Sequence, residues 1–295
     1  MNRAHVAMRR AGRRIMVMPP TCLIIRAAGT NCDRELAHAF TLAGACCELV
    51  HLNPLINRPD LIAQADLIGF PGGFSFGDDI AAGRIMANRL RHRLLEPLRA
   101  AIDRGVPIIG ICNGFQVLVK AGLLPDPDMG RQAATLADNA TGRFVDKWVG
   151  VTVPSDTVCI WTRGIKTIEL PIAHGEGRFV PESADLLQRW RHAGQIAFEY
   201  ADGDNPNGSV DGVAGVCDPS GLVLGLMPHP ERYTHVTNHP RWQRHRGGDE
   251  RVVGLKLFEN AVEYVHSRSS KPAPAGSGSA PGALGAPGAL GAPGA

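Results

Sequence analysis

The sequence has no hydrophobic run that approaches the length of a membrane-spanning helix. It also has no basic stripe. Its formal net charge is +3, yet five arginines and no acidic residue fall within the first twenty residues, so the remainder carries 3 − 5 = −2. A near-neutral folded body argues against a nucleic-acid partner, and the missing apolar run argues against a membrane protein.

The seven cysteines have neither the spacing of a disulfide framework nor that of a zinc ribbon, and their number is odd. No convincing signal peptide precedes them. These features predict a reducing, cytoplasmic location with free thiols. Residues 1–20 are rich in arginine and contain no acid, which is compatible with a targeting peptide. Their poor patterning favours instead a disordered extension or a start codon placed too early.

The C-terminal end has a different composition from the rest of the chain. From Ser267 onward Pro, Gly and Ala dominate, and the motif Ala280-Pro-Gly-Ala-Leu-Gly recurs at 286–291. Such a composition cannot bury a core, so residues 267–295 are expected to be a disordered tail. The body of the chain, residues 21–266, is expected to form one α/β domain.

Within this body, the first half alternates between strand and helix patterns. Strands are expected at 22–26, 47–51, 66–70 and 107–110, and helices at 33–43, 60–65 and 80–102. This alternation predicts right-handed βαβ units and a mostly parallel sheet. After a loop-like stretch at 125–141, strands are expected at 144–153, 167–172, 195–200, 213–217 and 222–227, with helices at 183–192 and 252–266. The second half is therefore expected to complete the sheet with partly antiparallel strands.

A sharp turn follows the fourth expected strand. The segment Gly110-Ile-Cys112-Asn-Gly114 has the pattern of a nucleophile elbow, which joins a strand to a helix. Glycines two residues before and after the nucleophile are needed because side chains there would strike the neighbouring strand and helix. The helix N-terminus favours a thiolate at Cys112. The alternative is a buried cysteine in a glycine-flanked turn, and the pattern alone does not decide between them.

A catalytic cysteine needs a base, and the base needs an orienting group. His229 and Glu231 follow the last expected strand, and alternate residues of an extended segment face the same way. Pro230 stiffens the spacing between them. His174 and Glu176 have the same His-x-Glu spacing and compete for this assignment. The position of His229 after a core strand and its flanking prolines favour the first pair.

The loop Pro71-Gly72-Gly73 follows the third expected strand. If that strand lies beside the fourth, the N–H groups of Gly73 and Asn113 could form an oxyanion hole. A tight turn or a phosphate cradle is the alternative, although the loop lacks the Lys-Ser/Thr ending of a P-loop.

Together, Gly110–Gln116, Pro71-Gly-Gly and Pro228-His-Pro-Glu231 resemble the class I (triad) glutamine amidotransferases. Further motifs resemble the PurQ-type glutaminase subunits of phosphoribosylformylglycinamidine synthase: Gly29–Asp33, Pro71–Asp78, Ala173–Phe179, Asn207–Ser209 and Gly254–Phe258. The likeness covers about residues 21–266. It implies a flavodoxin-like three-layer sandwich with a mostly parallel central sheet and extra antiparallel strands.

The resemblance also implies roles for the matching positions. Cys112 would attack the side-chain amide of L-glutamine, His229 would transfer protons, and Glu231 would orient His229. Gly73 and Asn113 would donate the oxyanion-hole N–H groups, and Gln116 would help to hold the substrate. Asn31, Asp33, Ser75, Asp78, His174 and Glu176 match the family motifs without an implied role.

A partner chain is implied as well. The ammonia would pass to an ATP- and Mg-dependent PurL-type synthetase subunit, together with a small PurS-type subunit, to aminate formylglycinamide ribonucleotide in purine biosynthesis. No cofactor or metal is expected in this chain. His229, His235, His239 and His245 form a loose run, but a solvated loop is favoured over a metal site. A stand-alone flavodoxin-like Cys hydrolase and a non-catalytic regulatory subunit are the alternative functions.

Overall fold

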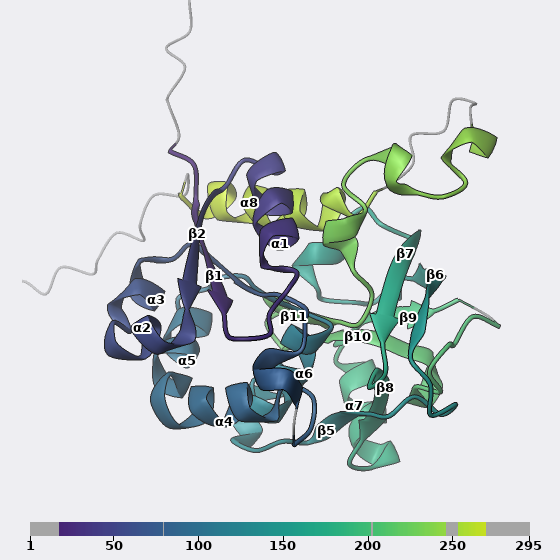
Figure 1. Cartoon of the computed structure of the whole chain (residues 1–295), viewed down its shortest axis with the longest axis horizontal. Helices are drawn as coiled ribbons and strands as arrows, with labels where there is room; N and C mark the ends of the chain where they lie inside the picture. Colours follow the sequence, from purple (N-terminus) through teal and green to yellow (C-terminus); the bar gives the residue numbers. More distant parts are fainter. Residues whose placement is uncertain (1–17, 79, 202, 246–252, 270–295) are drawn as a thin grey trace, which may run out of the picture.

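The computed structural model describes residues 18–78, 80–201, 203–245 and 253–269. Within these ranges, nine strands form one sheet in the order β2-β1-β3-β4-β11-β10-β9-β6-β7 (Figure 1). Their bounds are β1 Thr21–Arg26, β2 Cys46–His51, β3 Leu67–Phe70, β4 Ile108–Ile111, β6 Val145–Thr152, β7 Thr167–His174, β9 Ile196–Tyr200, β10 Val213–Cys217 and β11 Val223–Leu226. A second, two-stranded sheet pairs β5 (Ala134–Ala137) with β8 (Arg178–Pro181).

The first five strands of the large sheet, β2 to β11 in the spatial order, are mutually parallel. Every residue of β3, β4 and β11 is buried. Their uninterrupted apolar runs follow from this position, because helices cover both faces of a parallel sheet. The remaining strands, from β10 to β7, pair antiparallel, and β7 alternates buried with partly buried residues. The expected mostly parallel sheet with antiparallel strands from the second half is confirmed.

Helices flank the sheet on both sides (Figure 1). Their bounds are α1 Asp33–Leu42, α2 Leu52–Asn57, α3 Asp60–Gln64, α4 Arg84–Arg93, α5 Leu95–Asp103, α6 Asn113–Ala121, α7 Ala184–His192 and α8 Leu255–Ser269. On one side α1 packs on α8, where the rings of Phe40 and Phe258 meet edge to face at 5.0 Å. On the other side Leu118 of α6 and its neighbours pack under β4. The result is a three-layer sandwich.

The single helix expected at 80–102 is wrong, because the structure has two helices there. The break is at Leu94, where φ is −132° and ψ is 4°. Pro97 explains it: proline has no N–H to donate to the carbonyl four residues back, at Arg93, and its ring would clash with that carbonyl. α4 therefore ends at Arg93, and α5 restarts with Pro97 in its first turn.

The loop expected at 125–141 is also wrong in part, since it contains β5. This strand alternates buried with partly buried residues and pairs antiparallel with β8. Four residues rich in alanine carry little strand propensity, so the partner strand rather than the local sequence defines β5. The short helix α2, which has Pro54 in its first turn, was not expected.

The expected N-terminal extension and C-terminal tail lie mostly outside the described residues. Of the extension, the structure describes Met18 to Pro20, and the Pro20 carbonyl accepts a hydrogen bond from the Cys46 N–H at 2.9 Å. Helix α8 continues to Ser269, three residues into the segment expected to be a tail. No helix in the described ranges combines the length and the apolar character needed to cross a membrane.

Candidate active site

Cys112 occupies the turn between β4 and α6 with φ 52° and ψ −105°. A positive φ is strained for a residue with a side chain, and such strain is found mainly at functional sites. The flanking glycines have clear steric reasons. A Cβ on Gly110 would lie 2.6 Å from Leu118 Cδ1, and one on Gly114 would lie 2.0 Å from the Phe70 carbonyl oxygen. The turn is therefore a nucleophile elbow in its geometry as well as in its sequence.

The loops after β3 and β11 converge on this elbow, because both strands lie parallel to β4 on either side of it. Gly72 marks the meeting point. A Cβ placed there would lie 2.9 Å from His229 Cε1, 3.2 Å from Cys32 Sγ and 3.6 Å from Cys112 Cβ. The structure thus brings together the residues expected from the two loops and from the elbow. It adds Cys32, which no spacing argument had singled out.

His229 and Glu231 form a buried pair, with 2% and 0% of their side chains exposed. Nδ1 of His229 lies 2.6 Å from Oε1 of Glu231. The other ring nitrogen, Nε2, is buried and has no hydrogen-bond partner among the described residues. Burial alone would lower the pKa of His229, but the negative charge of Glu231 and the neighbouring thiol groups of Cys112 and Cys32 raise it well above 6.5. The pair therefore favours the imidazolium form of His229.

Gly73 has φ +141°, and a Cβ there would collide with the backbone of residues 29–31. Its N–H and that of Asn113 donate no hydrogen bond in the described part of the chain. The Asn113 side chain is fully engaged. Its Oδ1 accepts from the Ser75 N–H at 3.1 Å, while its Nδ2 donates to Asp78 at 3.1 Å and to Gln116 at 3.0 Å. The side chain therefore ties the loop to α6 and leaves the backbone N–H to face a substrate.

Gln116 lines the same cavity as Cys112, but both ends of its side-chain amide are engaged. Its Oε1 accepts from Asn113, and its Nε2 donates to the Glu176 carbonyl at 2.5 Å. Gln116 is 4% exposed. Its contacts favour a role in holding the segment around Glu176 rather than in direct contact with a substrate.

The competing pair, His174 and Glu176, does not form in the structure. Nδ1 of His174 lies 3.1 Å from Asn139 Oδ1, whereas Oε2 of Glu176 accepts from the Ala82 N–H at 3.3 Å. Burial, reinforced by the positive charge of His229, lowers the pKa of His174 to about 4. His174 is therefore neutral at physiological pH, and no carboxylate among the described residues orients it.

These residues surround a cavity of about 470 Å³. Its volume is in the lower part of the range for small-molecule sites. Cys112 lies on its wall with Sγ 3.8 Å from the Ala173 carbonyl oxygen. The charged residues of the lining have both signs, as a zwitterionic ligand requires: Asp78, Asp138, Asp146, Glu176, Arg143 and Arg232. The exposed rings of Phe74 and Phe144 also belong to the lining.

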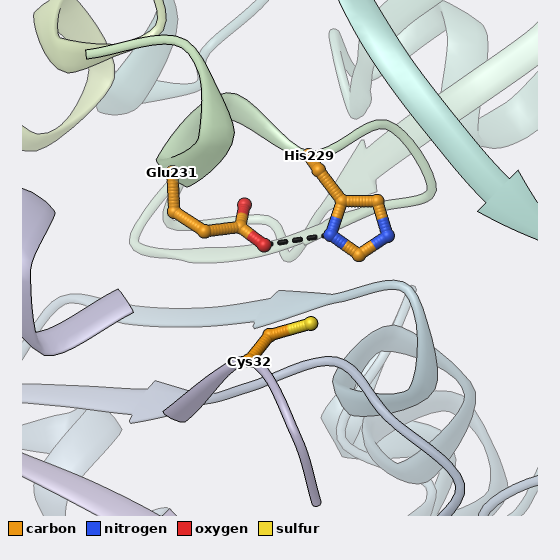
Figure 2. A group of neighbouring side chains, drawn as sticks. All are labelled: Cys32, His229 and Glu231. Carbon is orange, nitrogen blue, oxygen red and sulfur yellow. Dashed lines mark hydrogen bonds and ion pairs between the residues drawn. The ribbon is translucent and has the colours of Figure 1, made fainter. Parts of the chain in front are cut away.

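Cys32, His229 and Glu231 offer ligand atoms that all lie within 4.8 Å of one another (Figure 2). By donor chemistry alone, these side chains could ligate a thiophilic metal ion. Two contacts oppose it. Arg232 Nη2 donates to Cys32 Sγ at 3.0 Å, which places a positively charged guanidinium beside the sulfur, and Glu231 is already paired with His229. The arrangement fits a proton-transfer site better than a metal site.

The remaining histidines of the expected loose run lie elsewhere. His239 Nε2 is 3.3 Å from Glu169, and its ring packs 4.4 Å from that of Trp148. His235 caps its own short 3₁₀ helix, Val236–Asn238. The side chain of His245 lies outside the described part of the structure.

Comparison with known proteins agrees with this geometry. Residues 19–265 match the family described as the CobB/CobQ-like glutamine amidotransferase domain. The chain belongs to this glutamine amidotransferase family, and the resemblance drawn from its motifs is confirmed.

The relatives define the branch of the family. The phosphoribosylformylglycinamidine synthase subunit PurQ of Dehalococcoides mccartyi is 43% identical and aligns with 82% of this chain and 96% of its own length. The PurQ subunit of Pyrococcus furiosus is 37% identical, with 81% and 96% covered. A chain of the solved structure of PurLQS from Thermotoga maritima superposes with a TM-score of 0.65 at 32% identity, over 84% of this chain and all of that one.

Proposed function

We propose that this protein is the glutaminase subunit of a phosphoribosylformylglycinamidine synthase. The thiolate of Cys112 attacks the side-chain amide carbon of L-glutamine, and the oxyanion accepts hydrogen bonds from the Gly73 and Asn113 N–H groups. His229 Nε2–H protonates the amide nitrogen, the C–N bond breaks and ammonia leaves, which gives a γ-glutamyl thioester. His229 then takes a proton from water, whose oxygen attacks the thioester; the C–S bond breaks, which releases glutamate and restores the Cys112 thiolate. Glu231 holds the ring and stabilises its charged form.

One observation carries this proposal. Glu231 engages Nδ1 of His229 and leaves Nε2 buried without a described partner in the cavity that Cys112 lines. His174 also has Nε2 without a partner among the described residues, but its Nδ1 lies beside the Asn139 amide, whereas Nδ1 of His229 is held by a carboxylate that stabilises the imidazolium. In this proposal, Nε2 of His229 is the nitrogen that exchanges protons with the substrate amide and with water.

The second half of the reaction requires a partner. The relatives carry the name of a synthase subunit, and the superposed chain comes from the structure of PurLQS. The ammonia passes to a PurL-type synthetase that uses ATP and Mg to convert formylglycinamide ribonucleotide to the amidine, with a PurS-type subunit completing the complex. All seven cysteines are free, which fits the cytoplasm.

The test compares two nitrogen sources in the assembled complex. Replacing Cys112 with Ala should lower glutamine-dependent synthesis by about 10⁴-fold or more while ammonia-dependent synthesis persists. Cys159→Ala removes another buried thiol and should retain both activities. Glutamine-dependent synthesis at the wild-type rate in Cys112→Ala would exclude the mechanism.

A further inference from the structure

The motif Gly29–Asp33 lies beside the site, although the reaction gives it no role. Residues of this segment form the loop between β1 and α1, and the loop after β3 pairs with it. The N–H groups of Asn31 and Cys32 both donate to the Gly72 carbonyl, at 3.3 and 3.2 Å, and Phe74 N–H donates to Gly29. Thr30 and Gly73 form an antiparallel bridge.

These hydrogen bonds set the direction of a particular peptide group. The Gly72 carbonyl and the Gly73 N–H belong to one planar trans unit, so they point in opposite directions. The two hydrogen bonds that the Gly72 carbonyl accepts therefore fix the direction of the Gly73 N–H, which we assign to the oxyanion hole. A glycine pair would otherwise have many backbone conformations available.

The side chain of Cys32 makes a second set of contacts, on the opposite half of the site. Its Sγ lies 3.1 Å from Asn31 Oδ1 and accepts from Arg232 Nη2 at 3.0 Å. The sulfur points toward the imidazole of His229 (Figure 2), and Cys32 is 1% exposed. One residue thus forms a hydrogen bond to the oxyanion loop through its backbone and places its sulfur within 4.8 Å of a ring nitrogen of the base.

We propose that Cys32 is a positioning residue that aligns the oxyanion-hole peptide with the imidazole of His229. This inference rests on the proposed function. The two groups sit on loops from β3 and β11, which have β4 between them and approach each other at Gly72, where an added Cβ would lie 2.9 Å from His229 Cε1. Cys32 comes from a third loop and joins them. A thiol suits this place because it is small, tolerates burial, and both donates and accepts weak hydrogen bonds.

The test uses the full chain in its complex with the synthetase and the variants Cys32→Ala and Cys32→Ser. Cys32→Ala should lower kcat for glutamine hydrolysis by about tenfold to a hundredfold, because small misplacements of reacting groups are costly. KM for glutamine should change by less than about threefold, since the substrate does not bind to Cys32 in this proposal. Serine keeps the donor and acceptor, so Cys32→Ser should recover at least part of the rate.

The pH profile separates positioning from a purely structural role. Contact with Cys32 favours the charged form of His229, so Cys32→Ala should move the alkaline limb of kcat to lower pH. The matched control is Cys22→Ala, which removes a fully buried thiol from β1 and should leave the limb in place. If Cys32→Ala has the same kcat and the same alkaline limb of the pH profile as Cys22→Ala, the inference is wrong. If Cys32→Ala does not fold, Cys32→Val, which also removes the donor and the acceptor, is measured in its place and the same outcomes apply.

Labelling with a glutamine-like chloroketone distinguishes the two levels of failure. Labelling of Cys112 in the wild-type complex and slower labelling in Cys32→Ala would support both proposals. Equal labelling rates would overturn the role of Cys32 alone. Absence of label at Cys112 in the wild type, or label at Cys32 instead, would overturn the proposed function.

Discussion

At the scale of single residues, two histidines in one site have opposite electrostatic environments. His229 is surrounded by a carboxylate and two sulfurs, and its pKa lies well above 6.5. His174 has an amide for a neighbour and an imidazolium nearby, and its pKa lies at about 4. The same side chain is therefore charged in one place and neutral in the other at neutral pH. That contrast is the physical basis for assigning the base to His229.

His174 should make the protein sensitive to acid. The pKa of His174 is lower in the folded state than in the unfolded state, so at pH values between these two pKa values the unfolded state binds more protons. Unfolding therefore becomes easier as the pH falls from 6.5 to about 4. Linkage predicts a loss of about 2 kcal/mol in the free energy of unfolding between about pH 7 and pH 4.5. His229 has the opposite sign: its raised pKa contributes stability that is complete below 6.5 and is lost as the pH rises above it.

Urea unfolding of the wild type and of His174→Gln at both pH values tests this. The variant should lose about 2 kcal/mol less than the wild type between the two conditions, whatever its absolute stability. His38→Gln removes an exposed histidine from α1 and should keep the wild-type difference. Equal pH dependence in His174→Gln and the wild type would contradict the assignment.

Sequence reasoning identified the residues with a recognisable pattern around them. Cys112 lies between two glycines of the elbow motif, and His229 and Glu231 are two residues apart, so local patterns could indicate both features. Cys32 could not be found in this way, because it is 80 residues from Cys112 and 197 from His229. Its only signal was membership of the motif Gly29–Asp33. Contacts between distant loops depend on strand order, which local patterns do not encode.

At the scale of elements, the elbow depends on the close approach of α6 to β3. Gly114 is the point of contact, since a Cβ there would lie 2.0 Å from the Phe70 carbonyl oxygen. That oxygen belongs to a buried central strand and cannot move away cheaply.

Gly114→Ala should therefore cost about 3 kcal/mol or more of the free energy of unfolding, measured by urea denaturation. Gly164→Ala is the comparison. Gly164 has φ +75° with nothing within 4 Å of the added Cβ, so it reports the backbone strain alone, about 1–2 kcal/mol. If Gly114→Ala were as stable as Gly164→Ala, α6 would be able to shift away from β3 without a loss in the free energy of unfolding.

The elements that were predicted well are those whose own pattern is complete. The parallel strands β1, β3, β4 and β11 have continuous apolar runs. Helix α7 has Ser183 at its N-cap, and the Ser183 side chain accepts a hydrogen bond from the Leu186 N–H. The errors occurred where another element decides the structure. Leu94 continues a helical pattern and yet ends it because of Pro97, and β5 exists because β8 lies alongside it.

At the scale of the whole molecule, the order of the sheet assembles the site. β3, β4 and β11 are adjacent and parallel, so their carboxyl ends deliver the oxyanion loop, the elbow and the His229 loop to one edge. Ligands of open α/β sheets bind at this edge. The elbow and the His229 loop are far apart in the sequence, and only the topology brings them together.

The cavity at this edge should be governed by the partner. A glutaminase that runs without its synthetase wastes glutamine, so we expect glutamine hydrolysis by the isolated chain to be at least about tenfold slower than in the complex. Phe144 and Phe74 are 56% and 49% exposed in the cavity lining, and exposed aromatic side chains are enriched in protein interfaces.

Titration with the synthetase subunit tests this surface. Phe144→Ser should raise the Kd for the synthetase by about tenfold or more, which corresponds to about 1.4 kcal/mol of binding free energy. Leu42→Ser removes a comparably exposed apolar side chain, 49% exposed, from the far end of α1 and should leave the Kd unchanged. An isolated chain as active as the complex, together with an unchanged Kd in Phe144→Ser, would mean that the site is complete on its own and that the synthetase only receives its ammonia.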